Sequence, residues 1–345
     1  MIRIGLVGVG TMGRGHLEQY VRIMLEDDSI QLVALCDVDP KRFEVQTGDL
    51  NIEGVGKDVI DFSKYNLYND YDEMLAKEQL DMVDLVVPTY LHAEYAVKAL
   101  DKGLHVLCEK PMALNPDECQ RMIDARDRSG KQLMIAQCLR FWPAYEQLKA
   151  VAADGRFGKP VCAYLARYGG SPKGSYQDWY FDEAKSGGCL LDQHIHDVDM
   201  VQWVFGMPEA VSTTGRNVNP GAGFDALSTN YRYPDFTVNT QDDWTINGDG
   251  FGFDMPIRAN FEKGSVVHEK GKLTLYPNGE APVVPELPPD KGYYREIVYF
   301  LDHIKSGEPI ETSTPESTRD TIRVATAERI SAKQRGEWVK LASVN

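Results

Sequence analysis

The chain has 345 residues, of which 43% are hydrophobic, and its formal net charge is −15. This length exceeds what one ordinary hydrophobic core organises, so the composition predicts two folded domains and excludes a disordered chain. The acidic balance repels phosphate backbones and anionic lipids, which argues against nucleic-acid and membrane partners.

The N-terminal segment MIRIGLVGVG begins directly with a strand-like apolar run. It lacks the charged start, the longer apolar core and the cleavage site of a secretory signal, and no window approaches 18 uninterrupted apolar residues. The six cysteines are scattered without Cys-x-x-Cys pairs. This pattern favours buried thiols over disulfides or structural zinc and predicts a cytoplasmic protein.

The first third of the chain alternates apolar runs with helical patterns. Apolar, β-branched runs predict strands, and apolar residues spaced by three or four predict helices. An Asn-Pro pair at 115–116 is typical of a helix start. The predicted strands are 3–9, 32–36, 65–68, 84–87, 105–108 and 133–136, and the predicted helices cover 17–25, 95–100 and 115–129. This rhythm predicts a parallel, doubly wound α/β sheet covered on both faces.

The remainder of the chain has a different pattern, with strand-like runs separated by Gly, Asn and Pro as in an antiparallel meander. Two helical patterns follow, at 293–304 and 315–333. The predicted strands are 161–168, 211–214, 228–233, 236–240, 257–261, 266–268 and 272–276. These patterns predict an α+β second domain, which we place at residues 139–345.

A glycine motif lies between the first strand and the first helix, where residues 8–13 read GVGTMG. In a G-x-G-x-x-G motif, Gly8 allows a tight turn, Gly10 lets the backbone approach a pyrophosphate, and Gly13 lets the helix pack closely. The helix start, at Thr11 and Met12, offers free N–H groups to phosphates. The motif predicts a dinucleotide-binding Rossmann domain over residues 1–138. The alternative is a Gly-rich turn of an unrelated α/β domain.

Asp37 ends the second strand, 24 residues after Gly13. An acid at this position accepts hydrogen bonds from the adenosine ribose hydroxyls and repels a 2′-phosphate. The next residue, Val38, supplies no cation for such a phosphate. We therefore expect NAD as the cofactor, with NADP disfavoured.

The tripeptide Glu109-Lys110-Pro111 follows the fifth strand. Loops at the carboxyl ends of such strands border the cofactor crevice. Pro111 restricts the backbone of Lys110 to an extended conformation, and a cation held there could stabilise a developing alkoxide. The alternative is a surface lysine before a turn.

The segment 186–200 reads SGGCLLDQHIHDVDM and concentrates acids and histidines. If the segment is helical, Asp192 and His196 share one face and His194 points away. This geometry weakens a metal site, and we expect no metal. A carboxylate beside a histidine suits proton transfer near neutral pH. A structural Asp–His pair without chemistry is the alternative.

These motifs form an ordered set that includes RFWP at 140–143 and YYREIVYFLDHIKSG at 293–307. Together they resemble the Gfo/Idh/MocA oxidoreductases, the family of glucose–fructose oxidoreductase and inositol dehydrogenase, over nearly the whole chain. The resemblance implies Lys110, Asp192 and His196 as the catalytic residues beside the nicotinamide. It also implies a second domain with an open, mostly antiparallel sheet whose outer face often builds dimers or tetramers.

Further residues enter as weaker candidates. On the cofactor side, the resemblance adds the residues after the fourth strand and the acid of the EKP motif, namely Pro88, Thr89, His92 and Glu109. His92 could equally be a surface residue at a helix start. Candidate substrate contacts are Arg140, Arg167, Tyr176 and Trp179. Core packing is the alternative for the aromatic residues, and a solvated strand-end charge is the alternative for Arg167.

The chain departs from the family pattern at two places. Gln193 and His194 stand where the family more often has an apolar residue and a glycine. The polar stretch from Lys41 to Asn66 also looks longer than usual. Neither His194 nor this stretch receives a role from the sequence.

The combined prediction is an NAD-dependent dehydrogenase that oxidises a secondary hydroxyl of a sugar, inositol or related polyol. His196 would act as general acid/base, Asp192 would orient it or contact substrate, and Lys110 would hold the hydroxyl. One alternative is a glycoside hydrolase or lyase that uses bound NAD for transient oxidation. Another is a binding protein that senses NAD without turnover. A homodimer or homotetramer is expected because an exposed sheet face disfavours a monomer.

Overall fold

The computed structural model describes residues 1–44 and 60–344 and separates into two compact units. Unit 1 contains residues 1–113, 117–138 and 291–316, and unit 2 contains residues 114–116, 139–290 and 317–345. The predicted domain boundary at 138/139 remains a prediction. The contacts add residues 291–316 to unit 1 although they follow most of unit 2 in the chain.

Unit 1 is built on a six-stranded parallel sheet with the order β3-β2-β1-β4-β5-β6. Its apolar runs are buried on both faces, as the near-continuous Val, Ile and Leu content of parallel strands requires. The strands are β1 Ile2–Val7, β2 Ile30–Cys36, β3 Asn66–Tyr68, β4 Met82–Leu85, β5 His105–Glu109 and β6 Leu133–Ala136. The predicted Rossmann-type sheet is confirmed.

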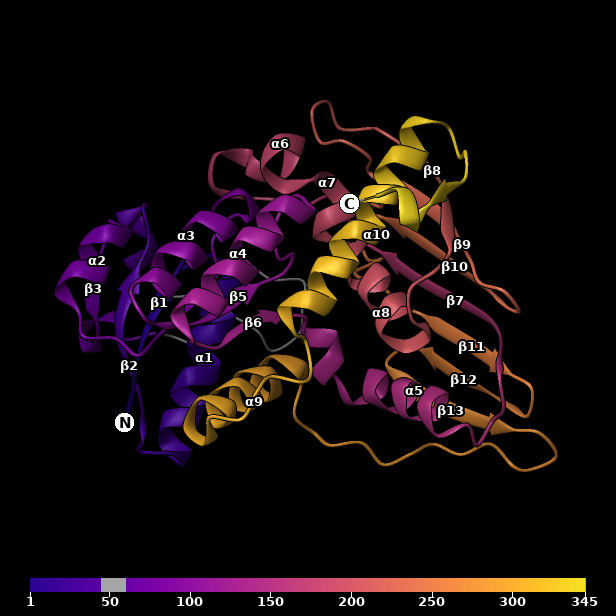
Figure 1. Cartoon of the computed structure of the whole chain (residues 1–345), viewed down its shortest axis with the longest axis horizontal. Helices are drawn as coiled ribbons and strands as arrows, with labels where there is room; N and C mark the ends of the chain where they lie inside the picture. Colours follow the sequence, from indigo (N-terminus) through magenta and orange to yellow (C-terminus); the bar gives the residue numbers. More distant parts are fainter. Residues whose placement is uncertain (45–59, 345) are drawn as a thin grey trace. The chain divides into compact units, whose positions relative to one another are not determined.

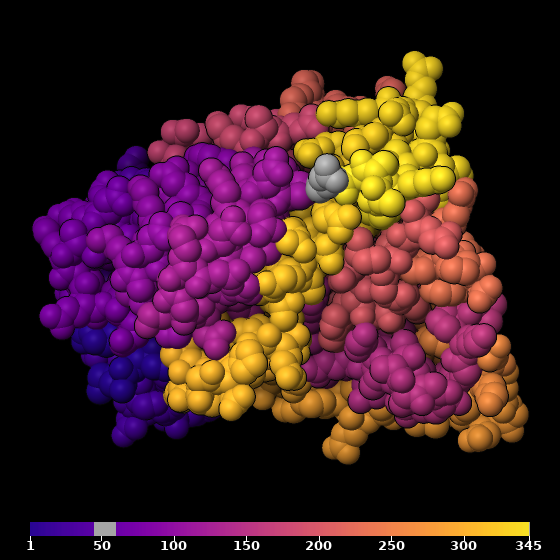
Figure 2. Space-filling model, in the orientation of Figure 1, coloured from indigo at the N-terminus to yellow at the C-terminus, as the bar shows by residue number. Residues whose placement is uncertain are grey.

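Helices cover this sheet, among them one from the far end of the sequence. Helix α9 packs against α1 and β6 (Figure 1), burying an apolar face that includes Ile297 and Phe300. In the space-filling view the orange residues of α9 lie beside the indigo residues of α1 (Figure 2). The helices are α1 Thr11–Glu26, α2 Tyr71–Lys77, α3 Thr89–Asp101, α4 Pro116–Ser129 and α9 Gly292–Ser306.

Unit 2 carries an eight-stranded sheet with the order β13-β12-β11-β7-β10-β9-β8-β14. All neighbours are antiparallel except β7 and β10, which run parallel at the centre of the sheet. The strands are β7 Pro160–Tyr168, β8 Ala210–Arg216, β9 Ala226–Arg232, β10 Thr237–Asp243, β11 Ile257–Phe261, β12 Gly264–Glu269, β13 Lys272–Pro277 and β14 Val339–Lys340. The predicted mostly antiparallel sheet is confirmed.

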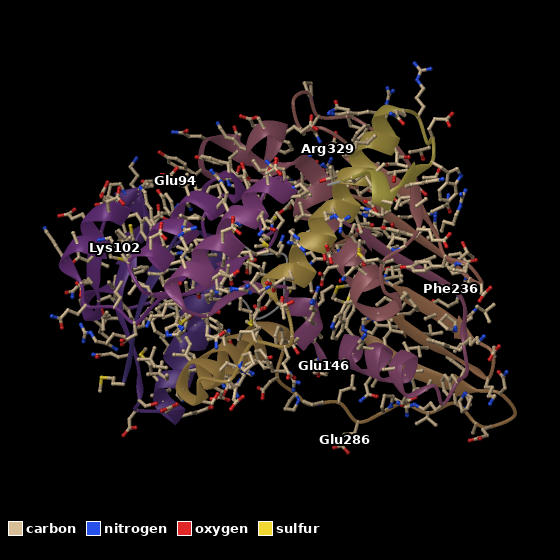
Figure 3. The ribbon with its side chains drawn as sticks, in the orientation of Figure 1. Glu94, Lys102, Glu146, Phe236, Glu286 and Arg329 are labelled. Carbon is tan, nitrogen blue, oxygen red and sulfur yellow. The ribbon has the colours of Figure 1, made fainter. Side chains whose placement is uncertain are left out.

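Helices of unit 2 pack on one face of this sheet, where α8 contacts both β7 and β10. The helices are α5 Pro143–Asp154, α6 Glu183–Ser186, α7 Gly188–Asp192, α8 Ile195–Phe205 and α10 Pro315–Lys333. Side chains alternate between the two faces along each strand. On β7, Leu165 and Arg167 are buried, whereas Tyr164 and Tyr168 belong to the open face. Phe236, labelled in Figure 3, stacks on Tyr233 after β9.

The polar stretch from Lys41 to Asn66 falls partly outside the described residues. Within its described ends the chain forms two short 3-10 turns, Pro40–Phe43 and Phe62–Lys64, before β3. The short strand expected near residues 65–68 is confirmed by β3. No helix among residues 1–44 and 60–344 is long and apolar enough to cross a membrane.

Candidate active site

The glycine loop of unit 1 has the geometry that a dinucleotide requires. Gly8 has φ +92°, and a Cβ there would lie 2.1 Å from the carbonyl oxygen of Val86. A Cβ on Gly13 would lie 1.9 Å from the carbonyl oxygen of Gly8, so helix and loop are in backbone contact. Gly10, in contrast, caps α1 and would place a Cβ within 4 Å of no described atom. The loop therefore presents open backbone at a helix N-terminus, which fits a pyrophosphate.

Asp37 directly follows β2 and lies beside this loop. Its carboxylate accepts hydrogen bonds from the backbone N–H groups of Val9 at 2.8 Å and Asp39 at 2.9 Å. Burial raises the pKa of Asp37, and these two hydrogen bonds offset part of the rise. The carboxylate thus stands beside the glycine loop, where the sequence placed the ribose-binding acid.

Glu109 ends β5 and faces the interior of unit 1. Its Oε1 lies 3.1 Å from Nε2 of His16, and its Oε2 accepts the backbone N–H of Lys110 at 2.9 Å. These contacts fix the backbone that carries the half-exposed Lys110 side chain. The predicted cofactor contact by Glu109 stays a prediction. The observed contact shows that the Glu109 carboxylate binds the backbone N–H of Lys110.

His92 connects the EKP loop to the end of β4. Its ring nitrogens lie 2.7 Å from the carbonyl oxygen of Pro111 and 2.8 Å from that of Val87. Burial lowers the pKa of His92, and the two carbonyl contacts counter this only in part. His92 is therefore not a surface residue. Pro88 caps α3 and Thr89 begins it, which leaves both at the carboxyl end of β4.

A cluster of buried charged side chains in unit 1 includes Glu109, the first residue of the EKP tripeptide. His16 Nδ1 is 2.8 Å from Asp84, which also accepts the hydroxyl of Tyr20 at 2.9 Å. Burial alone would lower the pKa of His16, but Asp84 and Glu109 raise it well above its ordinary value. The nearby Glu296 is fully buried, and burial together with Glu109 raises its pKa well above the usual range.

The same cluster has the composition of a metal site. Ligand atoms of His16, Glu109 and Glu296 lie within 4.8 Å of one another. However, both ring nitrogens of His16 already contact carboxylates, so metal binding through Nε2 would displace Glu109. We interpret the cluster as a buried imidazolium between acids, held by charge and hydrogen bonding.

In unit 2, the segment around Asp192 and His196 forms two helices instead of one. Helix α7 ends at Asp192 and α8 begins at Ile195, and the N–H of His194 reaches back to the carbonyl of Cys189 at 2.8 Å. The condition set for the shared face, a helical segment, is therefore met in two helices with a break between Asp192 and Ile195. The backbone between the helices nevertheless stays in the right-handed helical region.

Two glycines begin this segment because its backbone is tightly enclosed. Gly187 and Gly188 have φ of +75° and +68°, which few other residues adopt. A Cβ on Gly188 would lie 2.1 Å from the carbonyl oxygen of Ala222. The glycine pair therefore serves close backbone packing within unit 2.

Burial divides the polar side chains of this segment into two sets. Asp192 and His196 are half-exposed, whereas four others are buried. The buried four contact other elements of unit 2: Gln193 the carbonyls of Arg167 and Asp243, His194 the carboxylates of Asp242 and Glu328, Asp197 the guanidinium of Arg167, and Asp199 that of Arg140. The predicted catalytic pair is thus distinguished from residues that anchor α8.

The predicted substrate contacts at Arg140 and Arg167 have a different environment from the one expected. Arg140 makes two hydrogen bonds to Asp199, at 2.8 and 2.6 Å, and Arg167 lies 2.9 Å from Asp197. Both guanidinium groups are buried. Because unpaired charges cannot be buried cheaply, we interpret both arginines as internal counter-ions of α8. The alternative prediction, that Arg167 is a solvated charge at a strand end, is wrong.

Tyr176 and Trp179 lie in the irregular 3-10 segment Tyr176–Phe181. The Tyr176 side chain is exposed, and Trp179 stacks on Tyr180 with ring centroids 4.1 Å apart. Between them, Gln177 and Asp178 adopt positive φ values of 52° and 50°. Such conformations are uncommon outside glycine and mark segments constrained by their surroundings. Neither aromatic residue belongs to the buried core.

Nothing in the sequence indicated that four further residues belong to the buried charge networks beside the EKP motif and α8. They are His16, His194, Asp197 and Glu296. His16 follows the glycine motif by three positions, and His194 lies inside the segment that drew attention. Their partners, however, are up to 134 residues away. Only the fold brings these groups together.

Comparisons with known proteins agree with this geometry. A family model described as the oxidoreductase family with an NAD-binding Rossmann fold matches residues 2–137, and one for the GFO/IDH/MocA C-terminal domain matches residues 145–267.

Among individual proteins, a myo-inositol 2-dehydrogenase of Thermotoga maritima is 26% identical, covering 89% of this chain and 90% of that protein. A 2,7-anhydro-N-acetylneuraminate hydratase of Mediterraneibacter gnavus is 30% identical, covering 66% of this chain and 59% of that protein. A solved levoglucosan dehydrogenase with NADH and levoglucosan, 19% identical over 99% of both chains, shares the fold with a TM-score of 0.83. The chain therefore belongs to the Gfo/Idh/MocA family of oxidoreductases and binds NAD through its Rossmann domain.

Proposed function

We propose that the protein is an NAD-dependent dehydrogenase acting on a secondary hydroxyl of a sugar, inositol or related polyol. The observation that carries this proposal is the division of the polar residues in 192–199. Asp192 and His196 are half-exposed, while the other polar side chains of the segment are buried in contacts within unit 2. A half-exposed carboxylate and imidazole, spaced four residues apart, suit proton transfer to a bound alcohol.

The three residues receive separate roles. His196 takes the hydroxyl proton during oxidation and returns it during reduction. Asp192 orients the ring of His196 or contacts the substrate. Lys110 holds the same hydroxyl and stabilises the alkoxide as it forms. Because Lys110 belongs to unit 1 and the other two to unit 2, their convergence on one substrate is part of the proposal.

NAD supplies the hydride chemistry when bound, and the chain supplies position and charge. The glycine loop would hold the pyrophosphate, and Asp37 would accept the adenosine ribose hydroxyls. Val38, which is exposed, would offer nothing to a 2′-phosphate. These features support a preference for NAD over NADP.

The substrate class rests on the relatives. The Thermotoga maritima relative is named for myo-inositol, and the solved neighbour contains levoglucosan. Both are polyhydroxylated rings with secondary hydroxyl groups. An exposed Tyr176 and a half-exposed Trp179 would offer aromatic surface to such a ring.

A second candidate is favoured by the hydratase relative. A hydratase adds water to its substrate or removes it, with no net oxidation. A glycoside hydrolase or lyase that oxidised its sugar transiently and then reduced it again would likewise produce no net oxidation. The same Lys110, Asp192 and His196 would serve that reaction. A protein that only senses NAD is less well supported, because it would need none of the three.

The deciding experiment offers the purified protein NAD or NADP together with inositols, aldoses, sugar acids, anhydrosugars and glycosides. NADH absorbance is followed while mass spectrometry monitors the products. Growth of NADH with one polyol supports the dehydrogenase. A changed sugar without NADH supports the transient-oxidation candidate, and NAD binding without turnover of any compound contradicts both.

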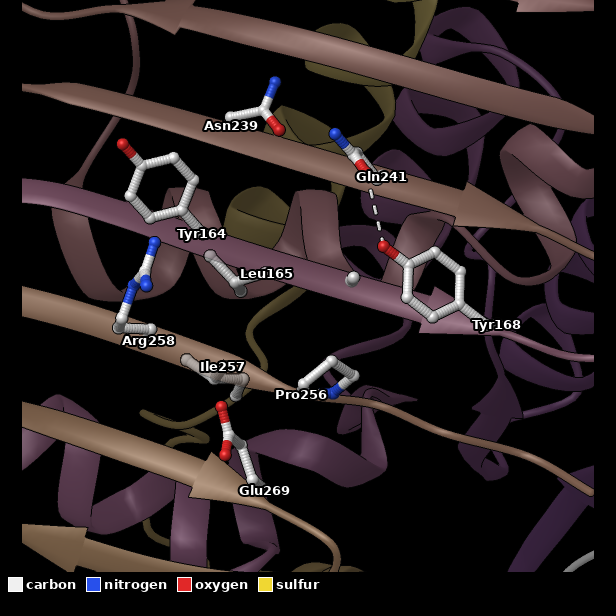
Figure 4. Close-up of a pocket in the computed structure, with 10 residues that line it drawn as sticks. Tyr164, Leu165, Tyr168, Asn239, Gln241, Pro256, Ile257, Arg258 and Glu269 are labelled. Atoms are coloured by element: carbon white, nitrogen blue, oxygen red, sulfur yellow. Dashed lines mark hydrogen bonds between the residues drawn. The ribbon is translucent and has the colours of Figure 1, made fainter.

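We also propose that the open face of the eight-stranded sheet joins copies of the chain. Tyr164, Tyr168, Gln241 and Arg258 lie on this face around a shallow hollow of about 230 Å³ (Figure 4), with Tyr168 bonded to Gln241 at 3.2 Å. Tyr164 is exposed, and an uncovered aromatic sheet face favours association. Light scattering on the wild type and on a Tyr164→Glu variant tests this; a wild-type monomer contradicts it.

A further inference from the structure

His194, which the family pattern does not predict, is enclosed by carboxylates in the interior of unit 2. Its Nδ1 lies 2.5 Å from Asp242 on β10, and its Nε2 lies 2.9 Å from Glu328 on α10. All three side chains are buried. Two carboxylates can both be satisfied by one imidazole only when both ring nitrogens carry protons. The ring is therefore an imidazolium that joins the sheet to α10.

The neighbouring groups extend this pair of contacts into a chain of charges. Asp197 on α8 lies beside Asp242 and bonds Arg167 on β7 at 2.9 Å. Tyr231 on β9 adds its hydroxyl close to Glu328. Two cations, His194 and Arg167, thus face three acids inside one unit. The acids outnumber the cations, so removing either cation leaves buried carboxylates without compensation.

The histidine also begins the helix that carries His196. The carbonyl oxygen of His194 accepts the N–H groups of Asp197 at 2.9 Å and Val198 at 3.0 Å, the first hydrogen bonds of α8. Asp192 precedes His194 by two residues, and His196 follows it by two. Movement of the His194 backbone would therefore move both members of the predicted catalytic pair.

We propose that His194 is a positioning residue, whose ring is held at both nitrogens by Asp242 and Glu328 and thereby sets the orientation of Asp192 and His196. The inference rests on the proposed function in one respect, because it assumes that this pair takes part in the reaction. An apolar residue of similar size at 194 could fill the space without binding either carboxylate. The imidazolium instead fixes the start of α8 to β10 and α10 at the same time.

The kinetic test compares His194→Gln, Glu328→Gln and the double variant. The single His194→Gln change leaves two buried carboxylates facing each other, and the added Glu328→Gln change removes one of these charges. We expect the double variant to recover most of the thermal stability lost in His194→Gln. We expect both variants containing His194→Gln to keep kcat at least about tenfold below wild type, the scale of a small displacement of catalytic groups.

The affinity for NAD separates positioning from general damage, since the glycine loop and Asp37 lie in unit 1. The dissociation constant for NAD should stay within about twofold of wild type in all three variants, well below the tenfold that 1.4 kcal/mol represents. His303→Gln, on α9 of unit 1, is the matched control and should leave kcat unchanged. A double variant that recovers both stability and kcat would show that His194 serves packing alone and would overturn the proposal.

A measurement without substrate keeps this inference separate from the proposed function. In protein labelled with ¹³C-histidine, the His194 resonance, assigned by its loss in His194→Gln, should be that of an imidazolium at pH 7. The His196 ring resonances, assigned by their loss in His196→Gln, should have changed chemical shifts in the double variant His194→Gln/Glu328→Gln, because the ring occupies a different environment. A neutral His194 at pH 7, or unchanged His196 chemical shifts in the double variant, overturns the inference. If both tests are passed and the wild type turns over no compound of the panel, the proposed function is refuted instead.

Discussion

Glu109 Oε1 lies 3.1 Å from Nε2 of His16, although 93 positions separate the two residues in the chain. This contact joins the helix after the glycine loop to the strand that ends directly before Lys110. The cofactor loop and the lysine are therefore parts of one hydrogen-bonded assembly within unit 1. The assembly is rich in acids, and Glu296 is the member with the weakest compensation, since neither of its oxygens has a hydrogen-bond partner among the described residues.

The Glu296→Gln variant should become more stable relative to wild type as the pH rises. The folded-state pKa of Glu296 is raised by burial, so wild type loses stability as the pH rises above the unfolded value of about 4.5 until the folded pKa is reached. The glutamine does not titrate. Urea denaturation at pH 5 and pH 8 should show a relative gain on the order of 1–3 kcal/mol. Parallel stability curves for the two proteins would contradict the buried-acid interpretation; exposed Glu308→Gln is the control.

Substitution by alanine should have different effects at Gly10 and Gly13 of the glycine loop, residues 8–13. Gly13→Ala places a Cβ 1.9 Å from a carbonyl oxygen, so it should lower the free energy of unfolding by about 2–4 kcal/mol. Gly10→Ala meets no atom within 4 Å and should leave stability unchanged. Its methyl group would instead occupy the approach of the pyrophosphate and weaken NAD binding at least about tenfold, equal to 1.4 kcal/mol. Thermal melts and NAD titrations distinguish the two; unchanged NAD affinity in Gly10→Ala would place the phosphates elsewhere.

Asp37→Ser should relax the choice between NAD and NADP. The serine keeps a polar side chain while removing the charge that repels a 2′-phosphate. We expect the affinity for NAD to fall and that for NADP to rise, so that their ratio narrows at least about tenfold. Titration of both dinucleotides measures this ratio. Asp39→Ser, two residues along the same turn, should preserve the ratio, and a preference for NAD that survives Asp37→Ser would remove this acid from cofactor selection.

His196→Asn and Lys110→Met should each lower kcat by about 10²- to 10⁴-fold on the substrate found in the screen, the usual contribution of a proton-transfer group. His196→Asn should also flatten the acid limb of the kcat profile, because the group that must lose a proton is gone. NAD affinity should change little in His196→Asn. Steady-state kinetics from pH 5 to pH 9 provide the test. A His196→Asn enzyme with the wild-type pH profile would assign the base to another residue.

Local patterns predicted most strands and the glycine loop because these depend on neighbours in the sequence. Apolar runs such as residues 105–108 and 133–136 became the buried strands β5 and β6 with small shifts at their ends. The positions of Lys110 and Asp37 at strand ends followed from the same patterns. Conformation at this level is determined within a few residues, so one sequence suffices to infer it.

Contacts between distant residues could not be predicted in this way. The helical spacing of Asp192 and His196 gave no sign that α7 and α8 are separate helices, and nothing near His194 in the sequence indicated its partners Asp242 and Glu328. For Arg167 the sequence likewise offered a substrate contact or a solvated charge, whereas the side chain is buried in an ion pair with Asp197. Which charges are buried depends on sheet register and helix packing, neither of which is local.

The placement of α9 has a consequence for synthesis on the ribosome. Strands β1 to β6 are complete once residue 136 has been made, but α9, which packs on α1 and β6, ends only at Ser306. All of β7 to β13 must be translated in between, so the nascent first unit exposes the apolar surface that Ile297 and Phe300 later cover. At ordinary elongation rates of about 5–20 residues per second, this exposure lasts on the order of 10–30 seconds. The interval is a window for chaperone binding or misassociation that a contiguous Rossmann domain would not have.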